Sequence, residues 1–123
     1  MAFKILVVDD ELDLVDTCAR LIEGLGYTCL KAFDGPQAIA MMHAEHPDLI
    51  VTDFNLPHGD GLEILRHAHE NRPEIPVIMM TGYHTPEMAR AASEAGVRAY
   101  LRKPFLTNEL TQAVRSALQV AKQ

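Results

Sequence analysis

The sequence lacks several features that define specialised classes of protein. It contains no tryptophan, only two cysteines among 123 residues, and no uninterrupted apolar run of the roughly 18 residues that a membrane-spanning helix needs. The amino terminus leads from Met1 directly into an apolar stretch, without the charged and small-residue flanks of a secretory signal peptide. These absences predict a cytoplasmic protein with no membrane segment.

The shortage of cysteine argues against a disulfide framework. Cys18 falls within a predicted helix and Cys29 within a predicted strand, and such thiols in a cytosolic chain are usually small core residues. We therefore expect neither a disulfide nor a cysteine metal site.

Positive charge is also scarce. The chain has 11 Lys and Arg residues against 17 Asp and Glu residues, and its formal net charge is -6. A nucleic-acid surface needs a basic patch or stripe, so this balance argues against direct DNA binding. Eleven of the acids lie in residues 1–60, whereas the last segment, residues 98–123, is mildly basic.

The hydrophobic content of 48% is sufficient for one core, and the length fits a single domain over residues 1–123. Five apolar runs alternate with five segments of helical periodicity. The predicted strands are residues 3–8, 27–32, 48–53, 75–80 and 99–101. The predicted helices are residues 11–25, 34–46, 60–71, 85–95 and 107 onward, and Leu12 and Val15 begin the apolar face of the first. This alternation predicts an α/β fold with a doubly wound parallel sheet.

The carboxyl ends of these strands carry the candidate site. In an open α/β sheet, ligands bind in the crevice at that edge, so the residues that follow each strand should converge there. They are Asp9 and Asp10 after the first strand, Asp53 at the end of the third, Thr81 after the fourth and Lys103 after the fifth. Three neighbouring carboxylates repel one another, and a hard divalent cation such as Mg²⁺ relieves that repulsion.

Such a site is suited to phosphoryl transfer. A carboxylate whose charge is screened by a cation can attack phosphorus, which makes Asp53 the candidate nucleophile. The ammonium of Lys103 would neutralise one phosphoryl oxygen, and the hydroxyl of Thr81 would hydrogen-bond another. Taken singly, each of these residues has an ordinary explanation, such as helix capping by the first acids.

With these residues in place, the chain resembles the receiver domain of bacterial two-component response regulators over its whole length. The motifs that carry the resemblance are Val7-Val8-Asp9-Asp10-Glu11, Asp53, Leu56-Pro57, Gly61, Thr81-Gly82, Tyr100 and Lys103-Pro104-Phe105. The resemblance implies a flavodoxin-like (βα)5 fold with strand order 2-1-3-4-5. It also implies a signalling phosphoacceptor rather than an enzyme with its own substrate.

The family pattern assigns roles to individual residues. It implies that Asp53 accepts a phosphoryl group from a sensor histidine kinase or phosphotransfer protein, with contacts from Thr81 and Lys103. It further implies that Asp10 binds Mg²⁺, that Asp9 assists, and that the backbone carbonyl of Asn55 is another ligand.

The resemblance also implies a cis peptide bond between Lys103 and Pro104, which proline makes accessible. Tyr100 corresponds to a switch aromatic that turns inward when Thr81 is drawn to the phosphate, changing a protein-binding face. Asn55 and Tyr83 occupy positions that tune the lifetime of the acyl phosphate in this family. The output partner is not identified, and a monomer or weak dimer is expected.

Two other functions fit parts of the pattern. A phosphatase of the haloacid-dehalogenase type also uses an aspartate nucleophile with Mg²⁺, but it needs a second acid where this chain has Asn55. An inert receiver-like binding module would be expected to lack Asp53 or Lys103, and both are present. The six histidines show no metal-ligand spacing and are predicted to lie mostly on exposed helix faces or ends.

Overall fold

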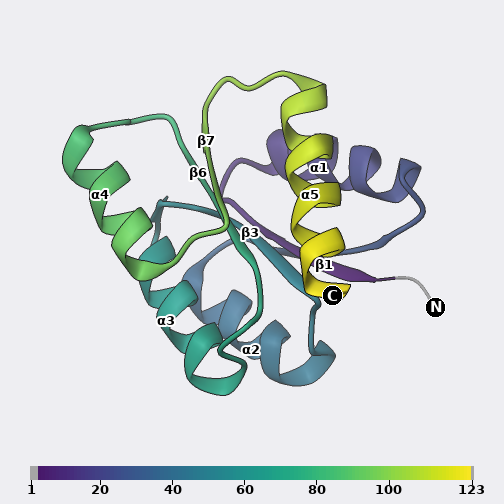
Figure 1. The fold of residues 1–123 in the computed structure, drawn as a ribbon, viewed down its shortest axis with the longest axis horizontal. Helices are drawn as coiled ribbons and strands as arrows, with labels where there is room; N and C mark the ends of the chain where they lie inside the picture. Colours follow the sequence, from purple (N-terminus) through teal and green to yellow (C-terminus); the bar gives the residue numbers. More distant parts are fainter. Residues whose placement is uncertain (1–2, 123) are drawn as a thin grey trace.

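The computed structural model describes residues 3–122, and the side chains of residues 3–119. Its centre is a five-stranded parallel sheet with helices on both faces (Figure 1). The strands are β1 (Lys4–Val8), β2 (Thr28–Ala32), β3 (Leu49–Asp53), β6 (Val77–Thr81) and β7 (Ala99–Arg102). Their order across the sheet is β2-β1-β3-β6-β7, which confirms the predicted doubly wound order.

The middle of the sheet is buried on both sides. All five residues of β3 and all five of β6 are buried, as expected for continuous apolar runs at the centre of a parallel sheet. The register pairs Val8 of β1 with Thr52 of β3, and Asp53 with Met80 of β6. The carboxyl ends of these three strands therefore lie side by side.

Five helices cover the two faces. They are α1 (Leu12–Gly24), α2 (Gly35–Glu45), α3 (Gly61–Asn71), α4 (Pro86–Ala95) and α5 (Thr107–Lys122). Helices α1 and α5 share one face, whereas α2, α3 and α4 cover the other (Figure 1). Each layer has its own core: Val51 and Leu110 belong to the first, and Ile50 and Ile64 to the second.

Side-chain caps fix the starts of three helices. Asp34 accepts a hydrogen bond of 2.8 Å from the Gln37 backbone, which begins α2. Asp60 begins α3 by accepting one of 2.9 Å from Glu63. At α4 the hydroxyl of Thr85 accepts a bond of 3.1 Å from the Met88 backbone. These starts confirm the predicted helix boundaries.

Helix α4 is the least embedded of the helices. Among its residues only Ala92 is buried, because its inner face consists of small side chains. Few buried apolar contacts mean a low local stability, so α4 is the element most easily displaced by a change at the neighbouring strand ends.

One predicted core residue is exposed. Leu12 is 62% exposed, whereas Val15, Cys18 and Ile22 form the buried face of α1. Leu12 is the first residue of α1, and the core covers the helix only from Leu14 and Val15 onward. The prediction that Leu12 belongs to the core was therefore wrong.

The segment after β3 contains a short hairpin that the sequence predicted only as a turn. Strand β4 (Asn55–Leu56) pairs with β5 (Gly59–Asp60) in antiparallel register. Between them His58 adopts a left-handed conformation with φ of 56°. Strands of two residues are too short to show a period of two, so their pattern carries no signal.

The other boundary differences are small. Strand β6 starts at Val77 rather than at residue 75, although the carbonyl of Pro76 still accepts a bond of 3.2 Å from Ile50. Cys18 is buried and Cys29 half-buried, and both are free thiols. No helix in the described part of the chain combines the length and the apolarity needed to span a membrane.

Candidate functional site

Three carboxylates meet at the carboxyl edge of the sheet. Asp9, Asp10 and Asp53 each place a carboxylate oxygen within 4.8 Å of the others. Asp9 is completely buried and Asp53 is 7% exposed, whereas Asp10 faces solvent. The pairing of β1 with β3 brings these positions together although they lie more than forty residues apart.

Lys103 provides the positive charge of this cluster. Its ammonium donates a hydrogen bond of 2.5 Å to Oδ2 of Asp9 and lies 3.4 Å from Oδ1 of Asp53. A third acid, Glu11, is 3.5 Å away, and the Lys103 side chain is only 13% exposed. One ammonium thus faces three carboxylates, which leaves the site with excess negative charge.

Burial, together with this negative charge, changes the pKa values of the two buried carboxyls. Burial raises the pKa of Asp53 to about 6; the charge of Asp9 adds to this, and Lys103 opposes it. Burial likewise raises the pKa of Asp9 above its ordinary value, although hydrogen bonds from Lys103 and the Glu11 backbone counteract it. Both carboxyls would hold their charge more easily beside another cation.

Lys103 itself remains a cation. Burial lowers its pKa, but the hydrogen bond to Asp9 and the charge of Asp53 raise it, and the net direction is upward. The lysine is therefore protonated at neutral pH and available to neutralise an anionic group.

Thr81 ends β6, the strand next to β3, and its side chain is fully buried. Its Oγ1 accepts a hydrogen bond of 3.0 Å from the backbone of Tyr83. The hydroxyl keeps its proton for donation to a second acceptor. After Thr81 the chain turns at Gly82. The side chain of the next residue, Tyr83, is exposed at the edge of the site.

The loop after Asp53 is held by close packing at Gly61. A Cβ at this position would lie 2.5 Å from the carbonyl oxygen of Asp53 and 2.6 Å from Sδ of Met79. The Gly61 backbone also donates a hydrogen bond of 2.8 Å to Phe54. Only glycine allows the start of α3 to approach the end of β3 so closely.

Tyr100 lies on β7 and contacts a histidine that sequence reasoning did not connect to it. The phenolic oxygen of Tyr100 is 3.2 Å from Nδ1 of His84, and the two rings meet edge to face with centroids 5.6 Å apart. Tyr100 is half-buried and packs against the core on the α3 and α4 side. The contact joins the predicted switch residue to the loop that follows Thr81.

Other predicted site residues have defined places. Asn55 is exposed and begins β4 directly beyond Asp53 and Phe54. The peptide bond between Lys103 and Pro104 is cis, which confirms that expectation. Glu11, which the sequence analysis placed in the first acidic motif and offered as a possible capping acid, makes no side-chain capping bond to α1 and lies beside Lys103.

A groove of about 530 Å³ opens beside Lys103. Its lining comes from the start of α1, the loop after β6 and the loop after β7. The residues are Glu11, Leu14, Gly82, Tyr83, Lys103, Pro104 and Phe105. The reactive edge of the sheet is therefore open to a partner molecule.

The fold and this site together define a class. A doubly wound sheet that presents an aspartate among further acids, a hydroxyl and a lysine is built for phosphoryl chemistry at a carboxylate. The model of the response regulator receiver domain family matches residues 5–115. The chain belongs to this family, the phosphoaccepting module of two-component signalling.

The sequences of known response regulators support this assignment. The chain is 34% identical over 122 residues to the response regulator MprA of Mycobacterium ulcerans, covering 99% of this chain and 53% of that protein. It thus spans about half the length of this relative.

Solved structures show the same fold. A CheY-like receiver domain protein from Methanospirillum hungatei is 30% identical with a TM-score of 0.94, covering 99% of this chain and 98% of that one. NtrX from Brucella abortus, solved in complex with ADP, is 35% identical with a TM-score of 0.92 over 99% of this chain and 28% of NtrX.

Proposed function

We propose that Asp53 accepts a phosphoryl group from the phosphohistidine of a sensor kinase or phosphotransfer protein. A carboxylate oxygen of Asp53 forms the new bond to phosphorus, and the bond between phosphorus and the donor nitrogen breaks, returning the electron pair to the imidazole. The observation that carries the proposal is the position of Lys103 between Asp9 and Asp53 at the end of β3.

The acidic cluster fits Mg²⁺. Its donor set is all oxygen, its net charge is negative, and Asp10 leaves one side of it open to solvent. We assign Asp9, Asp10, Asp53 and the backbone carbonyl of Asn55 as the residues that hold the ion. When bound, Mg²⁺ would screen the repulsion between the carboxylates and the incoming phosphoryl oxygens.

The chain's own residues then stabilise the transferred group. Lys103 would exchange part of its contact with Asp53 for a phosphoryl oxygen, since its ammonium is already only 3.4 Å from Oδ1. Thr81 would donate its hydroxyl proton to another oxygen. These positions are supported by the neighbouring ends of β3, β6 and β7.

The readout would begin at Thr81. A hydroxyl drawn toward the phosphoryl group pulls the loop that holds His84, and Tyr100 would lose or rearrange its contact with that ring. The loosely packed α4 lies next to this loop, so the surface formed by α4, β7 and α5 would change its shape. That surface is the proposed output of the domain.

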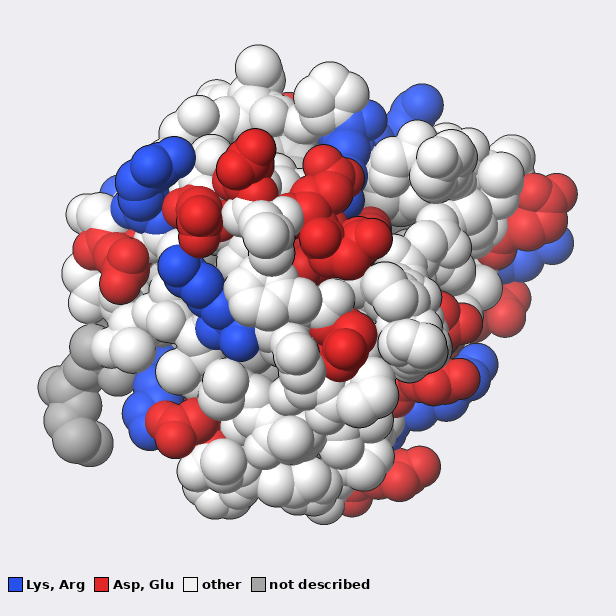
Figure 2. All heavy atoms as spheres, turned by 180° about the vertical axis from the view of Figure 1, so that it is seen from behind, with Lys and Arg blue, Asp and Glu red and all other residues white. Residues whose placement is uncertain are grey.

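The domain organisation, location, oligomeric state and partner are proposed from membership of the receiver domain family. We propose a single receiver domain over residues 1–123, a cytoplasmic location, a monomer or weak dimer, and an output partner in another domain or protein. Figure 2 shows one face of the molecule, on which acidic and basic side chains are interspersed and form no basic stripe. Together with the formal net charge of -6, this face supports a protein partner rather than direct contact with DNA.

The two rival functions are less well supported. A haloacid-dehalogenase phosphatase needs an acid where the exposed Asn55 begins β4. The inert binding module would have no need of Lys103 held between two buried carboxylates.

The experiment measures phosphoryl transfer to the protein and turnover of the phosphoryl donor at the same time. The chain is incubated with acetyl phosphate, with and without Mg²⁺, while the protein-bound phosphoryl group and the released phosphate are measured. We expect Mg²⁺-dependent labelling at no more than one group per chain, with slow release. Rapid multiple turnover without a labelled protein would indicate a phosphatase, and an unconsumed donor would indicate the inert module.

A further inference from the structure

Two histidines from neighbouring helices meet outside the acidic site. His43 lies in the last turn of α2 and His67 in the second half of α3, and their Nε2 atoms are 2.9 Å apart. The rings are perpendicular, with centroids 5.0 Å apart. Sequence patterns did not predict this pair, because 24 residues separate its members.

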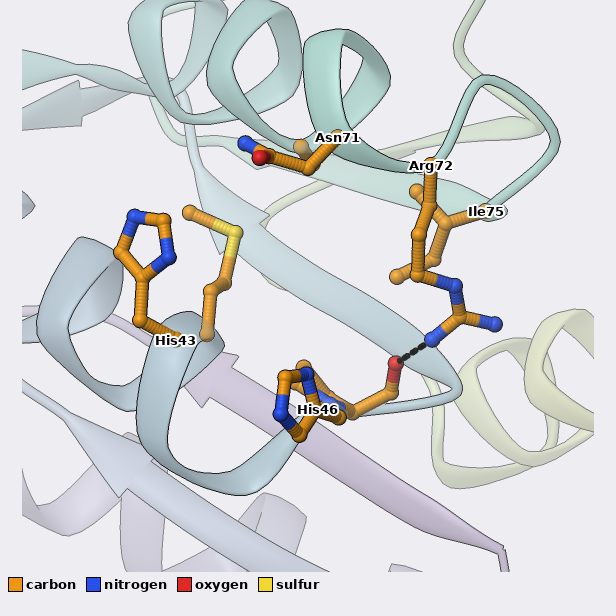
Figure 3. Close-up of a pocket in the computed structure, with 8 residues that line it drawn as sticks. His43, His46, Asn71, Arg72 and Ile75 are labelled. Atoms are coloured by element: carbon orange, nitrogen blue, oxygen red, sulfur yellow. Dashed lines mark hydrogen bonds between the residues drawn. The ribbon is translucent and has the colours of Figure 1, made fainter.

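The pair is remote from Asp53. Helix α2 starts at the carboxyl edge of the sheet and runs back toward the amino edge, so its last turn lies at the opposite end from the phosphoacceptor. A pocket of about 240 Å³ lies between the C-terminal ends of α2 and α3, and Figure 3 shows His43 at its side. His46 borders the same pocket.

The separation of the two nitrogens suits a metal ion. Imidazole nitrogen binds divalent transition metals at about 2.0–2.1 Å. Two such ligands at a right angle around one ion would have nitrogens about 2.9 Å apart, the spacing of adjacent ligands in tetragonal Cu²⁺ or Ni²⁺ sites. The distance between His43 and His67 matches that value.

The ligands can adopt the required form at little cost. In the hydrogen bond of 2.9 Å one ring donates its Nε2 proton to the other, so metal binding requires that proton to leave this nitrogen. Both Nε2 lone pairs are then available to an ion beside the line that joins them. His43 is exposed, so its ring is free to turn toward that position.

The local field favours a cation. His43 lies in the last turn of α2, where backbone carbonyls carry partial negative charge. Arg72, the cationic residue that borders the pocket, donates a hydrogen bond of 2.6 Å to the carbonyl of Pro47. Figure 3 shows this guanidinium turned toward that carbonyl, on the other side of the pocket from His43.

We propose that His43 and His67 form a binding site for a divalent transition-metal ion of the Cu²⁺ or Ni²⁺ type. Water molecules complete the coordination, and the ion clamps α2 to α3. This site is independent of the Mg²⁺ cluster and of the proposed phosphoryl transfer.

The experiment measures Ni²⁺ binding by titration calorimetry in excess Mg²⁺, which occupies the acidic site. We expect one Ni²⁺ per chain and a rise in the melting temperature on binding. His43→Gln and His67→Gln should each weaken binding by at least about tenfold, because each removes one of two protein ligands. His46→Gln is the matched control and should bind Ni²⁺ as the unchanged chain does.

Several outcomes would overturn the proposal. They are the absence of Ni²⁺ binding, binding by the His43→Gln or His67→Gln variant that is as tight as that of the unchanged chain, or a loss of binding with His46→Gln alone. Circular dichroism in chelator establishes that each variant is folded before titration. Labelling by acetyl phosphate in Mg²⁺ should be the same in all of these chains, which separates this site from the acidic one.

Discussion

Lys103 donates a hydrogen bond of 2.5 Å to Asp9, joining the end of the first strand to the loop after the last. Ninety-four residues separate the two, and the sheet order alone brings them together. Asp53 lies 3.4 Å from the same ammonium. The lysine therefore balances two buried acids until a metal ion or a phosphoryl group competes for it.

Lys103→Ala removes the positive charge that lies between Asp9 and Asp53. Asp9 and Asp53 would be left as neighbouring buried carboxylates, and breaking a buried ion pair on one side costs about 3 kcal/mol. We expect a loss of this size in the free energy of unfolding at neutral pH in chelator, and partial recovery when Mg²⁺ is added. Urea unfolding followed by circular dichroism measures both values.

Lys31→Ala is the control for this stability change. Lys31 pairs with Asp16 at 3.0 Å, but both side chains are exposed, so its loss should change the free energy of unfolding very little. Equal losses for the two variants would contradict the special position of Lys103.

The same substitution should separate phosphorylation from its readout. Lys103→Ala retains Asp53 and the acids that hold Mg²⁺, so labelling by acetyl phosphate should persist. The phosphoryl group would lack its ammonium partner, and the shift of the Tyr100 amide signal in nuclear magnetic resonance spectra should shrink. A full shift in the labelled variant would show that Lys103 has no part in the switch.

Stability in the absence of divalent metal should fall as pH rises from about 4 to about 6. The pKa of Asp53 is raised from 3.8 to about 6 in the folded chain, mainly by burial. Between these values the folded state holds the proton that the unfolded state has lost, so each step upward in pH favours unfolding. At 1.36 kcal/mol per pKa unit, the contribution is on the order of 3 kcal/mol.

Asp53→Asn provides the comparison for this pH dependence. The variant carries no charge at this position, so it should be more stable than the unchanged chain at pH 7 in chelator, and the difference should disappear near pH 4. Chemical unfolding across this range measures the two curves. Parallel curves would mean that Asp53 titrates normally.

Gly61→Ala should damage both stability and labelling. The new methyl group would lie 2.5 Å from the carbonyl oxygen of Asp53, which must shift to admit it. Overpacking of this kind costs about 1–3 kcal/mol and would move the acceptor's backbone. Gly24→Ala, where nothing lies within 4 Å, is the matched control and should be neutral or slightly stabilising. Thermal unfolding and acetyl phosphate labelling test the pair.

Much of the fold was predictable because strand and helix periodicities differ clearly in this chain. The buried runs that became β3 and β6, and the caps at Asp34, Asp60 and Thr85, are local signals that the packed structure preserves. The convergence of the strand-end residues followed from the parallel topology.

Contacts between side chains of different elements were not predictable in this way. The pairing of His84 with Tyr100, and of His43 with His67, depends on how each loop and helix is rotated against its neighbour. Hydrophobic periodicity gives the buried face of a helix but not the partner of a polar residue at its margin. The exposure of Leu12 has a similar cause, since periodicity does not show at which residue of a helix its contact with the core begins.

The most direct test of the central claim is the intact mass of the chain after incubation with acetyl phosphate and Mg²⁺. We expect one added phosphoryl group on the unchanged chain and on Asp60→Asn, which alters an acid that caps α3, and none on Asp53→Asn. Labelling of Asp53→Asn at the normal rate and extent would contradict the assignment of Asp53 as the phosphoacceptor.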